Sequence, residues 1–233
     1  MVTYSEKQLK PIDELCPMWE VLTQEERFYL RENTKLQHFR KNEVIYCEGE
    51  TPKFMMCLVT GKVKIYKDGV GGRSQIIRLI KPIDIFGYRA FFAKEPYLTS
   101  ASTIESSSAY LVPMQVVEQI IQSNNKLALY FIQSLASDLG VDDARIVSLT
   151  QKHVRGRLAE SLIMLRDNYG VESDGRTINS HLSREDLANY SNMTTSNAIR
   201  TLSNFVSEGV IAVSGRNIQI LDEEQLRKIS KIG

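Results

Sequence analysis

Residues 182–221 read LSREDLANYSNMTTSNAIRTLSNFVSEGVIAVSGRNIQIL. Ser183 stands three positions before Asp186, a near capping box that predicts the start of a short helix. A tight turn at 191–193 ends that helix, and Thr194 is placed to cap a second one. Gly209 predicts the end of the second helix, because glycine readily adopts the left-handed conformation that closes helices. The stretch therefore predicts two helices joined by a tight turn.

A β-hairpin is expected directly after the second helix. Residues 210–213 and 218–221 are rich in β-formers, and a turn containing Gly215 separates them. A helix–turn–helix followed by a hairpin describes a winged helix–turn–helix, whose second helix fits the major groove of DNA. That helix is expected to bury an inward stripe, which consists of Ala198, Leu202, Phe205 and Val206.

The residues expected to contact DNA lie outside this inward stripe. Arg200 is the expected base reader, because a bidentate arginine–guanine pair is the commonest specific contact. Arg184, near the start of the first helix, and Arg216, at the hairpin tip, are expected to reach phosphates, as is the start of the second helix. A ligand-sensing module that acts through protein contacts is the alternative function. The expected DNA-binding residues are Arg184, Thr194, Thr195, Ser196, Asn197, Arg200 and Arg216.

The N-terminal half has a different texture. Between residues 36 and 113, short β-rich runs alternate with turn residues such as Gly49, Gly61 and Gly87. This spacing is typical of an all-β barrel or sandwich. Pro113 ends the strands, and a short helix is expected over 114–122.

A long helix is expected from about 126 to 149. Along it, apolar residues recur at alternating spacings of four and three, which is the heptad rule for helices that pair. Asp142 is the one charged member of this seam. An amphipathic helix that merely covers the β-domain is the alternative. The expected dimer seam contains Ile132, Leu135, Leu139 and Ile146, with Ala128, Asp142 and Leu149 in the same register.

The expected fold is therefore of the α+β class, in three parts. Residues 1–122 form a β effector domain, residues 123–149 a dimerisation helix, and residues 150–233 the winged helix–turn–helix domain. If the seam is two-fold, the two copies of Asp142 lie close together, and like charges in such a site raise a carboxyl pKa. The alternative is that the helix splays at Asp142 and both carboxylates are solvated.

Composition narrows the function classes. The chain has 233 residues, is 42% hydrophobic and carries a net charge of +1, so no strongly basic block announces nucleic-acid binding. The three cysteines have no metal-type spacing, and no membrane span or signal peptide is visible, so a cytoplasmic protein without a metal site is expected. No phosphate loop, nucleophile motif or other catalytic constellation is legible, so an enzyme is not expected.

The whole chain resembles the cyclic AMP receptor protein/FNR (Crp/Fnr) family of bacterial transcription regulators. The resemblance rests on the order and separation of several short motifs over two hundred residues: Ile45-x-x-x-Gly49-Glu50, Thr60-Gly61-Lys62-Val63, Phe86-Gly87, Leu182-Ser183-Arg184-Glu185-Asp186-Leu187-Ala188 and Arg200-x-Leu202. It implies a jelly-roll domain of the cyclic-nucleotide-binding type, a homodimer, and a pseudo-palindromic site on double-stranded DNA. The resemblance also implies RNA polymerase and an unidentified small-molecule effector as candidate partners.

Departures from the family pattern fall at the effector pocket. Nucleotide-binding members carry a glutamate where this chain has Tyr88, and an arginine where it has Thr99. A threonine cannot pair with an anionic phosphate, so no cyclic AMP response is expected, and any cofactor is unknown. Tyr88 either lines the pocket mouth or fills the vacated pocket. The expected pocket residues are Tyr88, Arg89, Thr99, Ser100 and Asp142.

Overall fold

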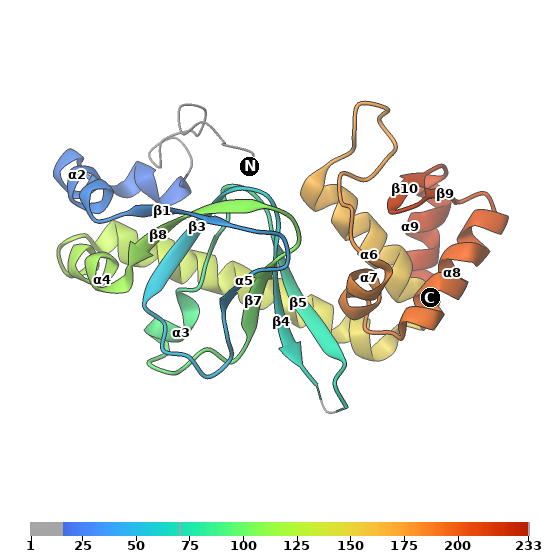
Figure 1. Cartoon of the computed structure of the whole chain (residues 1–233), viewed down its shortest axis with the longest axis horizontal. Helices are drawn as coiled ribbons and strands as arrows, with labels where there is room; N and C mark the ends of the chain where they lie inside the picture. Colours follow the sequence, from blue (N-terminus) through green and yellow to red (C-terminus); the bar gives the residue numbers. More distant parts are fainter. Residues whose placement is uncertain (1–15, 70, 233) are drawn as a thin grey trace. The chain divides into compact units, whose positions relative to one another are not determined.

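A computed structural model describes residues 16–69 and 71–232 of the chain (Figure 1). The helices and strands run in the order η2 (Pro17–Val21), α2 (Gln24–Glu32), β1 (Lys35–Phe39), β2 (Val44–Tyr46), β3 (Phe54–Thr60), β4 (Val63–Asp68), β5 (Ser74–Ile80), β6 (Ile85–Phe86), α3 (Arg89–Phe92), β7 (Ser100–Thr103), β8 (Ser107–Pro113), α4 (Met114–Ser123), α5 (Asn125–Gln151), α6 (Val154–Tyr169), α7 (Arg184–Tyr190), α8 (Thr195–Ser207), β9 (Ile211–Ser214), β10 (Asn217–Ile220) and α9 (Glu223–Ile232).

The described chain divides into two compact units. The first takes in residues up to 67 and residues 78–138, and the second takes in residues 68–77 and everything from 139 onward. The long helix α5 contributes its N-terminal half to the first unit and its C-terminal half to the second.

The N-terminal β-region consists of two four-stranded sheets, whose strands are drawn in blue to green in Figure 1. One has the order β1-β8-β3-β6 and the other β2-β7-β4-β5. Neighbours are antiparallel; Lys35 pairs with Leu111, and Val63 with Thr103. Gly61 has a φ of +89°, and a Cβ there would lie 2.2 Å from the Ser107 hydroxyl. Only glycine therefore allows the β3–β4 turn to lie directly on the start of β8.

Strand β3 explains how two separate cores share one sheet. Its residues Phe54–Thr60 are almost continuously apolar, and successive side chains point to opposite faces. Met56 and Leu58 belong to the core that also takes in residues of the second sheet. Met55 and Cys57 belong to a second core, which includes residues of α2, α4 and α5. A strand buried on both faces needs no polar alternation, which is why its sequence reads as one apolar run.

Local sequence features place the helix boundaries. Thr23 and Glu26 form a capping box at the start of α2. The break between α4 and α5 falls at Asn124, whose side-chain oxygen accepts from the backbone N–H groups of Lys126 and Leu127. That carboxamide satisfies orphan donors of α5, so α4 and α5 remain separate helices.

The C-terminal elements form the predicted helix–turn–helix with a two-stranded wing. Ser183 caps α7 and Thr194 caps α8, each side chain accepting from the N–H three residues on. In the wing, Asn217 pairs with Ser214 around Gly215, whose φ is +57°. Helix α9 follows the wing; its Leu226 and Ile229 are buried, and it packs on α6. The α+β fold class is confirmed.

Candidate nucleic-acid interface

Helix α8 has one face in the core and one polar face outside it. Ala198, Leu202 and Phe205 are buried, as expected from the inward stripe. Val206 was expected on the same face but is exposed, because the helical turn carries it past the edge of the core. The inward stripe is therefore narrower than the apolar pattern indicates.

The polar face of α8 presents the residues expected to read DNA. Ser196 and Arg200 are exposed, and Thr195 and Asn197 are half-buried. Arg200 Nη2 donates to Asn197 Oδ1 at 2.8 Å. This i, i+3 contact orients the guanidinium along the helix surface before any ligand arrives. The pair thus offers the N–H donors of the Arg200 guanidinium and the carboxamide of Asn197 on the polar face of α8.

The N-terminus of α8 is capped and exposed. Thr194 Oγ1 accepts from the Asn197 N–H at 3.2 Å, which occupies one of the four orphan donors of the helix. No hydrogen bond joins the N–H groups of Thr195 or Ser196 to any other residue in the described part of the chain. Such N–H groups at a helix start can donate to a phosphate.

Arg184 does not lie free as a phosphate-contacting side chain. Its Nη2 donates to the Gly215 carbonyl at 2.5 Å, which ties α7 to the wing turn. Burial lowers the pKa of the guanidinium, and its Nη1 is buried with no partner among the described residues. Arg216, one residue further on in the same turn, is exposed. Arg184 therefore fixes the turn of the wing, and Arg216 is exposed at the same turn.

The C-terminal end of α8 is fixed to α6. Arg155 Nη1 donates to Glu208 Oε1 at 2.8 Å, and the guanidinium lies 4.8 Å from the centre of the Phe205 ring. The hydrogen bond from Arg155 holds the pKa of Glu208 below its usual range. Both ends of α8 thus have a defined place on the rest of the unit.

The expected effector-pocket residues have partners within the chain. Tyr88 is only 4% exposed, packs against Phe92 and Phe131, and its hydroxyl lies 3.1 Å from Ser134 Oγ. Burial raises the pKa of Tyr88. Of the two readings of Tyr88, this placement matches a ring that fills the core. Arg89 is exposed, and its Nη1 lies 2.8 Å from Glu95 Oε1.

The hydroxyl residues at the same site are also engaged. Thr99 hydrogen-bonds the Tyr46 hydroxyl, and Ser100 Oγ accepts from the Glu48 N–H at 2.9 Å. Asp142 is half-buried on α5 and has an interaction partner. Thr99, Ser100 and Asp142 therefore supply no cation for a phosphate.

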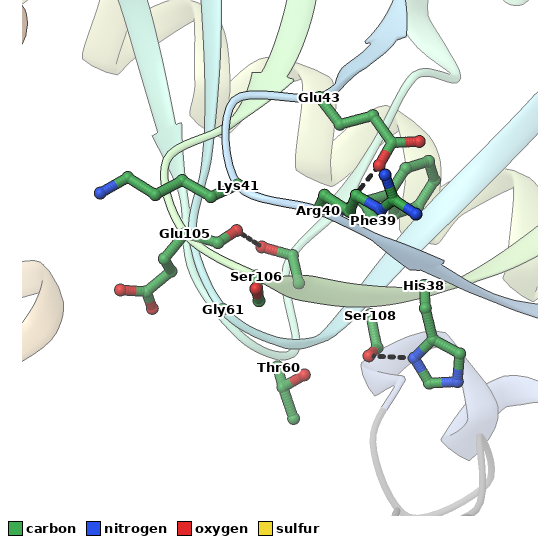
Figure 2. Close-up of a pocket in the computed structure, with 11 residues that line it drawn as sticks. His38, Phe39, Arg40, Lys41, Glu43, Thr60, Gly61, Glu105, Ser106 and Ser108 are labelled. Atoms are coloured by element: carbon green, nitrogen blue, oxygen red, sulfur yellow. Dashed lines mark hydrogen bonds between the residues drawn. The ribbon is translucent and has the colours of Figure 1, made fainter. Parts of the chain in front are cut away.

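Two cavities in the β-region lie away from those residues. Figure 2 shows the larger, about 1240 Å³, where Arg40 and Lys41 stand on the β1–β2 turn and His38 lies 2.8 Å from Ser108 Oγ. The smaller, about 520 Å³, borders the stacked rings of Tyr46 and Tyr97. Neither is lined by Tyr88, Arg89, Thr99 or Ser100.

Within residues 16–69 and 71–232, no group of three histidine, cysteine or carboxylate side chains is arranged to hold a metal ion. No helix of that part of the chain has the length and apolar character needed to cross a membrane.

Two family models match the chain. One, described as a cyclic nucleotide-binding domain, covers residues 36–124, and the other, described as a Crp-like helix-turn-helix domain, covers residues 156–229.

Curated relatives and a solved structure resemble the chain over most of its length. It is 25% identical over 191 residues to the CRP-like cAMP-activated global transcriptional regulator of Mycobacterium tuberculosis, covering 82% of this chain and 85% of that protein. It is 27% identical over 175 residues to the anaerobic regulatory protein of Bacillus subtilis, covering 74% of each. The structure of FixK2 from Bradyrhizobium japonicum superposes with a TM-score of 0.77 at 25% identity, covering 84% of this chain and 96% of that one.

The capped polar helix α8, the braced wing and the family matches all indicate a winged helix–turn–helix that binds DNA. The chain belongs to the Crp/Fnr family and is a DNA-binding transcription regulator, not an enzyme.

Proposed function

We propose that the protein is a homodimer that reads a pseudo-palindromic DNA site without cyclic AMP. The observation that carries the DNA-reading part is the Arg200–Asn197 pair, held at 2.8 Å on the exposed face of a capped helix. Arginine reads guanine and asparagine reads adenine through bidentate contacts in the major groove. Exposed N–H groups at the start of α8 and Arg216 at the wing tip supply phosphate contacts, which carry affinity rather than sequence.

An apolar stripe on α5 supports the dimer. Ile132, Leu139 and Ile146 are 61%, 62% and 60% exposed, and they recur every seven residues on one face. Leu129 and Ala136 extend this stripe. Solvent-exposed apolar residues in a heptad register are stabilised by a second copy of the same helix. A dimer about such a seam places two α8 helices on half-sites one helical turn apart.

The register of the stripe differs from the expected seam. Leu135, expected in the seam, is half-buried and packs on the second core, and Asp142 is half-buried as well. Asp143 is exposed and falls in register with Ile132, Leu139 and Ile146. We therefore assign Asp143, rather than Asp142, to the proposed dimer seam.

Independence from cyclic AMP rests on the partners of the pocket residues. Tyr88 stands where a ribose-binding carboxylate is expected in nucleotide-binding relatives, and it is buried with its hydroxyl at Ser134. Arg89 is paired with Glu95. A cyclic phosphate would have to displace that ion pair and reorganise an aromatic core, and both cost free energy.

Selection from a random-sequence duplex pool tests this function. The purified full chain, with no added ligand, is mixed with the pool, and bound DNA is sequenced. A two-fold-symmetric motif with half-sites one helical turn apart is expected, unchanged by added cyclic AMP. An asymmetric motif contradicts the homodimer, and enrichment only in the presence of cyclic AMP contradicts the independence from that ligand. If no sequence is enriched in either condition, specific DNA reading by this chain is contradicted.

A further inference from the structure

The turn between α7 and α8 is held by arginines from other elements. Helix α7 ends at Tyr190, and the last carbonyls of a helix have no partner within it. The carbonyl oxygens of Tyr190, Ser191 and Asn192 each accept a hydrogen bond from an arginine side chain. All the residues concerned belong to the second compact unit.

Arg145 is the arginine that reaches this turn from the long helix α5. Its Nη2 donates to the Tyr190 carbonyl at 3.0 Å and to the Ile76 carbonyl of β5 at 2.8 Å. Its guanidinium lies 4.3 Å from the centre of the buried Tyr190 ring. One NH₂ group thus bridges two backbone carbonyls while the planar cation stacks on an aromatic face. Lysine, a point charge without a planar face, cannot reproduce this arrangement.

Arg157 holds the remaining two carbonyls from α6. Its Nε donates to Ser191 O at 3.1 Å and its Nη2 to Asn192 O at 3.0 Å. Its Nη1 donates to the Lys152 carbonyl at 2.9 Å, just beyond the end of α5. Each arginine therefore joins the α7–α8 turn to the backbone of another segment. Arg145 joins it to β5, and Arg157 joins it to the residue that follows α5.

A third contact reaches the turn from the β4–β5 hairpin. Arg73 Nη2 donates to Asn192 Oδ1 at 3.2 Å. Asn192 has a φ of +50°, in the left-handed region that asparagine tolerates better than most residues. The turn conformation that aims α8 is thus stabilised by its own asparagine and by side chains from three elements.

We propose that Arg145 is a positioning residue for DNA reading, which ties the turn that begins α8 to helix α5 and strand β5. This inference rests on the proposed DNA-reading function. Base contacts require a reading helix held to within a fraction of an ångström, whereas attraction to phosphates tolerates displacement. Loss of the Arg145 bridge should therefore weaken binding to the selected site more than binding to other DNA.

Three variants separate positioning from charge. Arg145→Gln removes the bridge and the charge, and Arg145→Lys keeps the charge without the bridge. Lys228→Gln, an exposed site on α9, removes the same charge elsewhere in the unit.

Dissociation constants are measured for the selected duplex and for a scrambled one at several salt concentrations, with circular dichroism as the check on folding. Both Arg145 variants should lose about 10-fold in the ratio of the two affinities, since a buried carbonyl is left unsatisfied. The Lys228→Gln ratio should equal that of the wild type.

Hydrogen exchange of the turn is the second readout, and it does not depend on DNA. Amide exchange in peptides spanning 187–197 should rise in both Arg145 variants and not in Lys228→Gln, with exchange in α6 unchanged. An unaltered affinity ratio in Arg145→Gln overturns the inference, as does full rescue by Arg145→Lys. If the wild type shows no preference for any duplex, the proposed DNA-reading function fails. The hydrogen-exchange result still tests the Arg145 bridge in that case, because unchanged exchange in Arg145→Gln shows that the bridge does not hold the turn.

Discussion

The guanidinium of Arg184 is bonded to the wing: its Nη2 donates to the Gly215 carbonyl oxygen at 2.5 Å. The hydrogen bond connects the first residue of α7 to the turn between β9 and β10, 31 positions along the chain. Arg184, the first residue of α7, therefore holds the turn between β9 and β10 in place.

Arg184→Gln should loosen the wing. The exposed Gly215 carbonyl would exchange a charged donor for water, which costs at most about 1.5 kcal/mol. Faster amide exchange over residues 211–220 is expected, together with weaker binding to every DNA sequence, because the wing supplies phosphate contacts. Arg176→Gln, a charge-matched change at an exposed loop residue, is the control. Normal exchange in the wing of Arg184→Gln would show that the bond does not hold it.

Arg200→Ala should abolish sequence discrimination. A bidentate arginine–guanine pair is worth about 1–3 kcal/mol of discrimination, so the ratio of selected to scrambled affinity should fall about 10- to 100-fold. Ser203→Ala, at an exposed position one turn further along α8, should leave that ratio unchanged. The measurement is a titration of both duplexes by fluorescence anisotropy. Retained discrimination in Arg200→Ala would refute the base-reading assignment.

Leu139→Glu should convert the proposed dimer to a monomer. Its side chain is 62% exposed at the middle of the α5 stripe, and a carboxylate there would be desolvated and brought close to its copy. Gln133→Glu adds the same charge at an exposed position off that stripe and should remain dimeric. Sedimentation velocity distinguishes the two species. A Leu139→Glu protein that sediments as a dimer would place the interface elsewhere.

Asp143→Leu and Asp142→Leu test which carboxylate lies in the seam. Asp143 is in register with the exposed stripe, so replacing it should remove like-charge repulsion and tighten the dimer by about 10-fold. Asp142 is half-buried with a partner in its own chain, so replacing it should not tighten the dimer. Sedimentation equilibrium gives both dissociation constants. The opposite ranking would return the seam to the register that contains Asp142.

Alkaline pH should destabilise the β-region through Tyr46. Burial raises the pKa of Tyr46 to about 12, above its unfolded value of about 10. The unfolded chain therefore releases this proton first, so stability is full below pH 10 and falls as the pH rises to 12. The loss attributable to Tyr46 is at most about 3 kcal/mol. Tyr46→Phe should lessen this slope in urea unfolding. An identical slope in Tyr46→Phe would exclude it as the group responsible.

Local chemistry in the sequence determined much of the DNA-binding domain. Ser183 and Thr194 cap the helices where expected, and Gly209 and Gly215 close a helix and a hairpin. These features act over three to five residues, so they are readable without knowing the fold. The resemblance of spaced motifs to the Crp/Fnr family supplied the rest of the architecture, and the family matches confirm it.

The bonds that fix the site could not be read in this way. Arg184 reaches Gly215 across 31 residues, and Arg145 joins Ile76 to Tyr190 across 69 and 45. An arginine in the sequence carries no indication of whether its partner is a distant carbonyl or a DNA phosphate, since both are acceptors for the same donors.

The heptad pattern of α5 did not determine which face of the helix is exposed, and the tertiary structure did. The apolar pattern of α5 fits more than one heptad register, because apolar residues face both its own domain and solvent. Packing of Leu135 on the core removes that register from the exposed face and leaves Asp143 on it. Sequence by itself determined the elements, their caps and their family. Tertiary structure decided which face of α5 is free, that Tyr88 is buried, and which arginines are committed to the fold, because burial and partner choice depend on contacts between residues far apart in the chain.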